Sequence, residues 1–354
     1  MATLLALERF VPPYRYSQEE VSRYVDEWLA GDASARRLLS VYASAGVSSR
    51  ASVVPIDEVF HPRSFEEQND RYREIAIQAG IELTRAALSQ AHIPPSSIGL
   101  IVSVSCTGLM IPAVDAYVAD ALGLGPRLAR LPITESGCAG GVVALARVRD
   151  YLVAHPKEAA LILGLEFASL TFQHWDHSAT NVVSTALFGD GGAAMVLVGD
   201  EHPRANCPAL ARVTGTASRF FPGTTHLMGF HLRNQGLQIV LDRELAPFVR
   251  REVAKTVEGF LEACGLRRED VTRFVLHPGG RRIIEVMAEQ LRLRAADLAP
   301  TEHVLAEHGN MSSVTVIFVL DEIVRRGGVK CGEKGLLGAF GPGFCAEFAL
   351  VEFC

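Results

Sequence analysis

The sequence predicts a layered α/β protein made of two halves with related architecture. Three observations lead to this prediction. The chain has 354 residues, which is long for one small core. Short β-rich apolar runs alternate with amphipathic helical segments, and each half closes on paired strands, as in a duplicated βαβ arrangement packed face to face. The best seam is DEHPRANCPA, residues 200–209, which divides the chain into residues 1–202 and 203–354.

The first half opens with a long helix at residues 65–91, where acidic residues come first and apolar residues then recur at helical spacing. The run IGLIVSVSC, residues 98–106, is typical of a strand buried on both faces. The same alternation predicts four further elements: a helix at Val114–Leu122, a strand before Ile133, a helix from Ala139 to about Ala154 and a strand at residues 159–168.

The second half repeats this alternation more loosely. We expect a strand at residues 237–242, a helix at Leu245–Cys264, a strand running into a turn at 273–280, and helices at Arg281–Leu293 and 311–326. Residues 335–353, GLLGAFGPGFCAEFALVEF, predict a β-hairpin, because a Gly-Pro-Gly turn separates two apolar strands.

Composition and charge narrow the class of protein. The chain is 49% hydrophobic and 21% charged, as in a globular protein. A net charge of -6 gives no overall attraction to nucleic acid or to an anionic membrane, and no apolar run is long enough for membrane insertion. The N-terminal segment lacks a signal-peptide pattern. Seven cysteines without metal-type spacing indicate reduced thiols in a cytoplasmic protein.

Cys138 lies in PITESGCAGG, a turn of small residues between a predicted strand and a predicted helix. A thiol at a helix N-terminus is favoured as thiolate, so this position suits a nucleophile. Two other polar residues follow apolar runs in the same way: His277 in FVLHPGG and Asn310 in EHGNMSS. Imidazole can take the thiol proton, and imidazole and carboxamide N–H groups can both stabilise an oxyanion.

Each of these three signals also has an ordinary structural interpretation. A cysteine in a glycine-rich turn is often a buried thiol, and a histidine before Pro-Gly-Gly is often a hydrogen-bonded turn residue. Spacing alone does not bring the three side chains into one pocket.

The segments ESGCAGG, ALFGDGGAA, LHPGG, GNMSS and AFGPG, in this order, resemble the type III polyketide synthases of bacterial type, the chalcone synthase-like members of the thiolase superfamily. The resemblance covers nearly the whole chain. It implies a homodimer of thiolase-like subunits with αβαβα layers and two pseudo-equivalent halves. It also implies a catalytic triad of Cys138, His277 and Asn310, loaded from an acyl-CoA and extended with malonyl-CoA, without metal or redox cofactor.

The resemblance also implies the residues that line the substrate cavity. Phe188 corresponds to the family's gatekeeper phenylalanine, although core packing would also explain it, and Ile239 stands where a second phenylalanine is usual. Ile111, before Pro112, corresponds to the residue that crosses the dimer interface into the partner's cavity. The other implied cavity positions are Cys106, Thr107, Ala168, Leu170, Thr171, Phe230 and Ser312.

The CoA-binding site departs most from the pattern of the plant enzymes in this family. Of the basic residues that those enzymes have at the mouth of the CoA tunnel, only Arg37 remains. Arg281 and Arg282 could bind phosphate instead, or could simply be solvated arginines. His174 and His177 have a spacing found in some zinc sites, but no third ligand accompanies them, so no metal is expected.

Apolar replacements at Cys106, Ala168 and Leu170 predict a fatty acyl starter of medium or long chain and release as an alkyl α-pyrone or alkylresorcinol. Ala168 would enlarge the substrate cavity and Phe230 would reduce it, so the number of malonyl-CoA extensions stays open. A ketoacyl-ACP synthase III is the nearest alternative enzyme, although it typically has His-Gln-Ala-Asn where this chain has HPGG. A non-catalytic acyl-CoA-binding protein is the alternative from another class, but it predicts loss of the triad.

Overall fold

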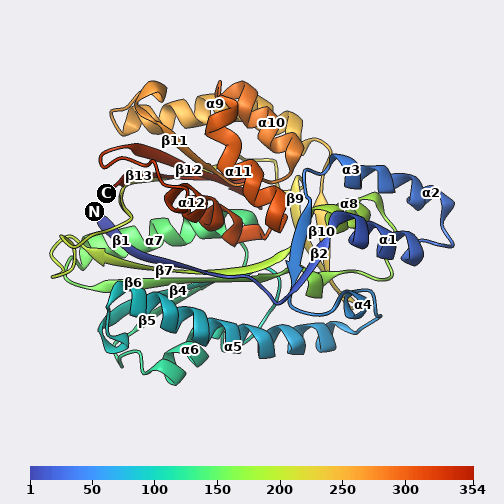
Figure 1. Ribbon diagram of the computed structural model, residues 1–354, viewed down its shortest axis with the longest axis horizontal. Coiled ribbons are helices and arrows are strands. Elements are labelled where there is room, and N and C mark those ends of the chain that lie inside the picture. The colour runs from blue at the N-terminus through green and yellow to red at the C-terminus, as the bar shows by residue number, and fades with distance from the viewer.

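The computed structural model describes residues 1–354 and arranges them in five layers, α–β–α–β–α (Figure 1). Its main sheet has nine strands in the order β11-β12-β13-β8-β1-β7-β6-β4-β5. The first half-sheet contains β1 (Ala2–Phe10), β7 (Asp190–Gly199), β6 (Ala159–Phe167), β4 (Ile98–Val104) and β5 (Ala129–Ile133). The second contains β8 (Ala211–Phe220), β13 (Cys345–Phe353), β12 (Lys334–Gly341) and β11 (Arg273–Leu276).

Four strands of each half-sheet have the same order and direction of pairing, which confirms the predicted duplication, and β5 adds a fifth strand to the first half-sheet. From β1 the first half-sheet runs through two antiparallel pairings, with β7 and β6, to a parallel pairing with β4. From β8 the second runs through antiparallel β13 and β12 to parallel β11. Only a short antiparallel pairing, Ala2–Leu4 with Ala211–Val213, joins them, so the two half-sheets can diverge from this pairing and enclose a layer of helices.

Six helices form the three α layers (Figure 1). Helices α5 (Phe65–Ala91) and α6 (Val114–Leu122) cover the first half-sheet, while α9 (Leu245–Ala263) and α10 (Arg281–Gln290) cover the second. Helices α7 (Gly140–Ala154) and α12 (Thr315–Arg325) lie between the half-sheets and share one hydrophobic core with both. Because α12 packs on several sides, eight of its eleven residues are buried, which is why it is apolar around most of its circumference.

The predicted elements of the layers are found within about four residues of their expected ends, the largest difference being α12, predicted from residue 311 and beginning at Thr315. The helices at 65–91 and 114–122 have the predicted bounds, and the hairpin at the C-terminus is β12 paired antiparallel with β13. The strand predicted at 237–242 is β10 (Gly236–Leu241), but it lies outside the main sheet. It pairs with β9 (Met228–Arg233), and these two strands form a separate antiparallel ribbon.

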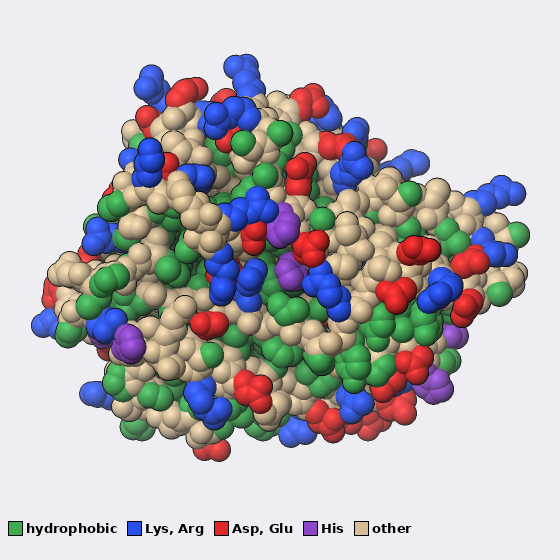
Figure 2. Space-filling model, viewed as in Figure 1, with side chains coloured by type: hydrophobic (Ala, Val, Ile, Leu, Met, Phe, Trp, Pro, Cys, Tyr) green, Lys and Arg blue, Asp and Glu red, His purple; other side chains and the backbone are tan.

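Three strands of the main sheet, β1, β7 and β8, were not predicted. Most of the other unpredicted elements gather at one end of the molecule, on the right in Figure 1. This cap consists of β2 (Tyr14–Ser17), α1 (Gln18–Trp28), α2 (Ala33–Arg36), α3 (Val41–Ser44), β3 (Ser49–Ser52), α4 (Ile56–Val59) and α8 (Ala179–Leu187). Helix α11 (Ala295–His308) leads into the segment that carries Asn310. None of the helices has the length and apolar character needed to cross a membrane. Basic and acidic side chains are interspersed over the face shown in Figure 2.

Candidate active site

Cys138 lies in a short 3₁₀ turn, Gly137–Ala139, immediately before α7, as the sequence predicted. It is buried, with 7% of its surface exposed. The small residues after it allow α7 to pack closely against the segment before α12. A Cβ on Gly141 would lie 2.3 Å from the carbonyl oxygen of Ser313, which is closer than packed atoms approach. The GCAGG sequence is therefore required to seat the thiol beside that segment.

Asn310 and Ser312 lie beside the Cys138 sulfur. The Ser312 hydroxyl is 3.7 Å from the Cys138 Sγ and 3.2 Å from the Cys106 Sγ. The carboxamide oxygen of Asn310 accepts hydrogen bonds from the Ser312 backbone N–H at 2.8 Å and the Thr315 hydroxyl at 3.4 Å. With its oxygen held in this way, the amide has its NH₂ group free to donate.

His277 follows β11 and is 2% exposed. Its backbone N–H donates to the Gly338 carbonyl at 2.9 Å, which ties it to the adjacent strand β12. Both ring nitrogens are buried without a hydrogen-bond partner, so no hydrogen bond joins the imidazole to Cys138 or Asn310. The structure thus brings Cys138 and Asn310 together and leaves the His277 ring buried and unpaired.

Burial controls the charge state of these groups. It raises the pKa of the Cys138 thiol to about 12, although Ser312 and Asn310 oppose this shift, and it lowers the pKa of His277 to about 3. The negative charge of Glu166 raises the thiol pKa further. For the thiol, the desolvation penalty therefore outweighs the stabilisation expected from the helix N-terminus, and for the imidazole burial disfavours the charged form.

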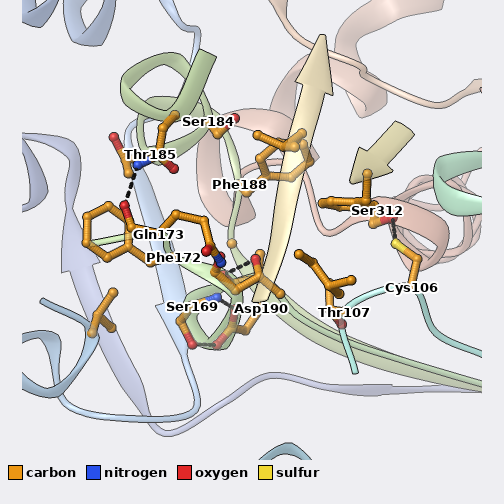
Figure 3. Close-up of a pocket in the computed structure, with 18 of the residues that line it drawn as sticks. Cys106, Thr107, Ser169, Phe172, Gln173, Ser184, Thr185, Phe188, Asp190 and Ser312 are labelled. Atoms are coloured by element: carbon orange, nitrogen blue, oxygen red, sulfur yellow. Dashed lines mark hydrogen bonds between the residues drawn. The ribbon is translucent and has the colours of Figure 1, made fainter. Parts of the chain in front are cut away.

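A cavity extends from Cys138 toward the cap and the β9–β10 ribbon, with about 130 Å³ open to water-sized molecules. In Figure 3, Phe188 lies between Ser312 and Cys106 on one side and Thr185 on the other. Eight of the predicted cavity residues line it: Cys106, Thr107, Ala168, Thr171, Phe188, Phe230, Ile239 and Ser312.

Other predicted site residues lie outside this cavity. Leu170 does not line it, because its side chain is buried in the core between the first half-sheet and α5. Ile111 is fully exposed, at 103% of its reference surface. Arg37, Arg281 and Arg282 are exposed as well, and the two later arginines pair with Glu285 at 3.2 and 3.4 Å.

Glu166, Arg50 and Asp190 were missed by the sequence reasoning, and all three are buried charged residues beside or within the cavity lining. The Glu166 carboxylate accepts hydrogen bonds from the Cys106 N–H at 3.1 Å, the Thr107 hydroxyl at 2.8 Å and the Ser313 hydroxyl. A single acidic residue inside the apolar strand AALILGLEF is a signal that could have found Glu166. The cap and ribbon supply further apolar lining: Val21, Ile56, Val59, Phe60, Met228, Leu237, Val240 and Leu241.

The histidine pair in FQHWDH does not belong to a metal cluster. His177 instead lies 3.5 Å from the Asp32 carboxylate and packs edge-on against Trp28. No group of three or more potential metal ligands is found in the chain.

The buried histidines predict that acid destabilises the fold. Burial lowers the folded-state pKa of His277 to about 3 and that of His308 to about 4, below an unfolded value near 6.5. The unfolded chain therefore gains protons first as pH falls, and each imidazole costs about 2 kcal/mol of stability at pH 5 relative to pH 7.5. In urea denaturation, His308→Leu should lose less stability than the wild type between these pH values. Equal losses would contradict the prediction.

Comparisons with known proteins agree with this architecture. Family models described as the N-terminal and C-terminal domains of chalcone and stilbene synthases match residues 59–202 and 212–353. The chain is 33% identical over 352 residues to 1,3,6,8-tetrahydroxynaphthalene synthase of Streptomyces peucetius subsp. caesius, covering 99% of this chain and 93% of that protein. It is 29% identical over 359 residues to the alpha-pyrone synthesis polyketide synthase-like Pks18 of Mycobacterium tuberculosis, covering 99% and 91%.

A solved structure gives the same result for the fold. The 1,3,6,8-tetrahydroxynaphthalene synthase of Streptomyces coelicolor A3(2), described as a bacterial type III polyketide synthase, superimposes with a TM-score of 0.92 at 28% identity, covering 99% of each chain. The thiolase-like fold class is confirmed. Because the family models cover most of the sequence and both halves of the fold correspond, the chain belongs to the chalcone and stilbene synthase family and is a type III polyketide synthase of bacterial type.

Proposed function

We propose that this acyltransferase takes a medium- or long-chain fatty acyl group from acyl-CoA, extends it with malonyl-CoA and cyclises the product to an alkyl α-pyrone or alkylresorcinol. The half comprising residues 1–202 supplies the nucleophile Cys138, and the half comprising residues 203–354 supplies His277 and Asn310. We infer a fatty acyl starter from one observation, the apolar lining of the cavity that begins at Cys138.

In the loading step, the Cys138 sulfur attacks the thioester carbonyl of the starter. A new carbon–sulfur bond forms, the bond to the CoA sulfur breaks, and the cysteine proton passes through His277 to the departing thiolate. Two features support this assignment. Both ring nitrogens of His277 are buried and free of protein partners, so one can accept a proton, and the Cys138 thiol opens into the same cavity in which the starter would lie.

In the extension step, malonyl-CoA loses its carboxylate as carbon dioxide, and the electron pair moves into the thioester to give an enolate. The enolate carbon then attacks the acyl group on Cys138 and displaces the sulfur. N–H donors from Asn310 and His277 stabilise the enolate oxygen. The orientation of the Asn310 amide supports this role, because its oxygen is occupied by Ser312 and Thr315 while its NH₂ remains available.

Chain length should affect turnover of saturated starters through burial of methylene groups. Each buried methylene is worth about 0.8 kcal/mol, or about fourfold in kcat/KM, until the cavity is full. A ladder of saturated acyl-CoA starters with malonyl-CoA, analysed by mass spectrometry, should show this rise and give alkyl α-pyrones or alkylresorcinols. Turnover confined to aromatic starters would refute the fatty starter.

A second candidate is synthesis of a naphthalene product from malonyl-CoA alone, because the relatives of this chain include a 1,3,6,8-tetrahydroxynaphthalene synthase at 33% identity. The reaction without any starter distinguishes the two candidates: a naphthalene product from malonyl-CoA alone would favour the second.

The CoA portion of both substrates would lie outside the cavity, where we propose that Arg37, Arg281 and Arg282 contact its phosphates. Support comes from the exposure of the two later arginines, whose side chains retain 61% and 69% of their surface, and from the packing of Arg281 against Gly46 of the cap. Their pairing with Glu285 is exposed and therefore weak, so phosphate can compete for them.

We also propose a homodimer in which Ile111 reaches the partner's cavity. The exposed isoleucine supports this, as does β5, which ends the main sheet and has four of its five residues exposed. Ile111→Glu should shift the protein from dimer toward monomer in light scattering, because a charge would be buried at the interface. An unchanged dimer would contradict this contact.

A further inference from the structure

Arg50 is a buried cation whose hydrogen bonds go to uncharged groups. It lies in β3, is 6% exposed and lines the cavity. Its Nη1 donates to the carbonyls of Thr185 at 2.5 Å and Phe188 at 2.8 Å, and its Nη2 donates to that of Ala186 at 3.0 Å. Nη2 also donates to the Gln18 side chain, and Nε is buried without a partner.

These carbonyls belong to the end of α8 and the residue after it. The last carbonyls of a helix have no partner within the helix and carry its partial negative charge. Arg50 supplies both the missing donors and a positive charge. Burial lowers its pKa only to about 10, with Tyr42 and Asp190 opposing the shift, so the guanidinium remains charged at neutral pH.

The segment that Arg50 holds is bonded directly to Asn310. The Asn310 N–H donates to the Leu187 carbonyl at 2.8 Å, and the Gly189 N–H donates to the Asn310 carbonyl at 3.1 Å. The backbone at this contact is tightly packed. A Cβ on Gly189 would lie 2.3 Å from the His308 carbonyl oxygen and 3.1 Å from the Arg50 Cβ. A shift of the Phe188 backbone would therefore displace Asn310.

We propose that Arg50 is a positioning residue, which holds the gate Phe188 and the carboxamide of Asn310 in place relative to Cys138. This inference rests on the proposed function. The proposal predicts different effects on the two steps of the reaction. Arg50 donates no hydrogen bond to Cys138 or to α7, which follows it, so acyl loading should not depend on Arg50. Loss of the guanidinium should weaken enolate stabilisation by Asn310 while leaving acyl transfer to Cys138 largely intact.

Arg50→Lys and Arg50→Gln test the proposal. A lysine keeps the charge but cannot bridge three carbonyls as a planar guanidinium does. Decarboxylation of malonyl-CoA to acetyl-CoA, measured by chromatography, should fall roughly tenfold in Arg50→Lys and roughly a hundredfold in Arg50→Gln, because small misplacements are costly. Starter loading on Cys138, measured by rapid-quench intact mass, should stay within about twofold of the wild type.

Leu88→Ala is the matched control, because Leu88 is buried on α5, in an outer layer away from the site. It should lower the melting temperature and leave the ratio of the two rates unchanged. Gln18→Leu removes the acceptor of Nη2 and the Gln18 donors to the Ala186 and Tyr42 carbonyls, but it keeps the guanidinium, and it should give a smaller shift of the same ratio. Equal loss of both rates in the Arg50 variants, or no loss in either, would overturn the positioning role. Failure of the wild type to load or decarboxylate would instead overturn the proposed function.

Discussion

Cys138→Ala should abolish acyl loading and lower product formation by at least about a thousandfold, since removing the nucleophile of a catalytic unit is among the most damaging single changes. Carbon cannot replace sulfur in the attack on a thioester. The substitution causes no crowding, because alanine is smaller than cysteine and leaves the Gly141 contact untouched. Intact-protein mass after incubation with acyl-CoA measures the loading directly.

Cys106→Ala is the control for this prediction. The Cys106 sulfur lies 3.2 Å from the Ser312 hydroxyl, which also contacts Cys138, so it is the second thiol at the site. Burial and the charge of Glu166 raise its pKa, which disfavours its thiolate. The Cys106→Ala protein should still acquire one acyl group. If Cys138→Ala were acylated instead, Cys106 would be the nucleophile.

Asn310→Ala should lower malonyl-CoA decarboxylation by about 10² to 10³-fold, the loss typical of one oxyanion donor in a buried site. Its backbone bonds to Leu187 and Gly189 do not depend on the side chain, so the surrounding segment should keep its structure. Starter loading should change little. Release of acetyl-CoA from malonyl-CoA, without a starter, gives the decarboxylation rate.

His277→Ala should impair both steps, because the proposal gives His277 the proton transfer in loading and an oxyanion contact in decarboxylation. This difference from Asn310→Ala distinguishes the two roles. A His277→Ala protein that loads the starter at the wild-type rate would show that the thiol proton leaves by another route. Loading and decarboxylation should be measured on the same protein preparations, with thermal unfolding to show that each variant is folded.

Most elements of the layered core could be predicted from the sequence because their periodicity is local. Helix α5 shows its acidic start and apolar face within 27 residues, and the glycine-rich turn at Cys138 marks a strand-to-helix junction. The cap could not be predicted in this way. Its helices are short, and they share a hydrophobic cluster with α10 and α11, which are distant in sequence.

By itself, the sequence determined the two-halved α/β architecture, the family and the candidate triad, because these depend on local patterns and ordered motifs. Only the tertiary structure decided the charge states and the surroundings of the site. It buried Cys138 and His277, which disfavours the charged form of each, placed Leu170 in the core rather than the cavity, and brought Arg50 to the end of α8. The physical reason is that desolvation and hydrogen bonding depend on which distant segments pack together, and no local pattern carries that information.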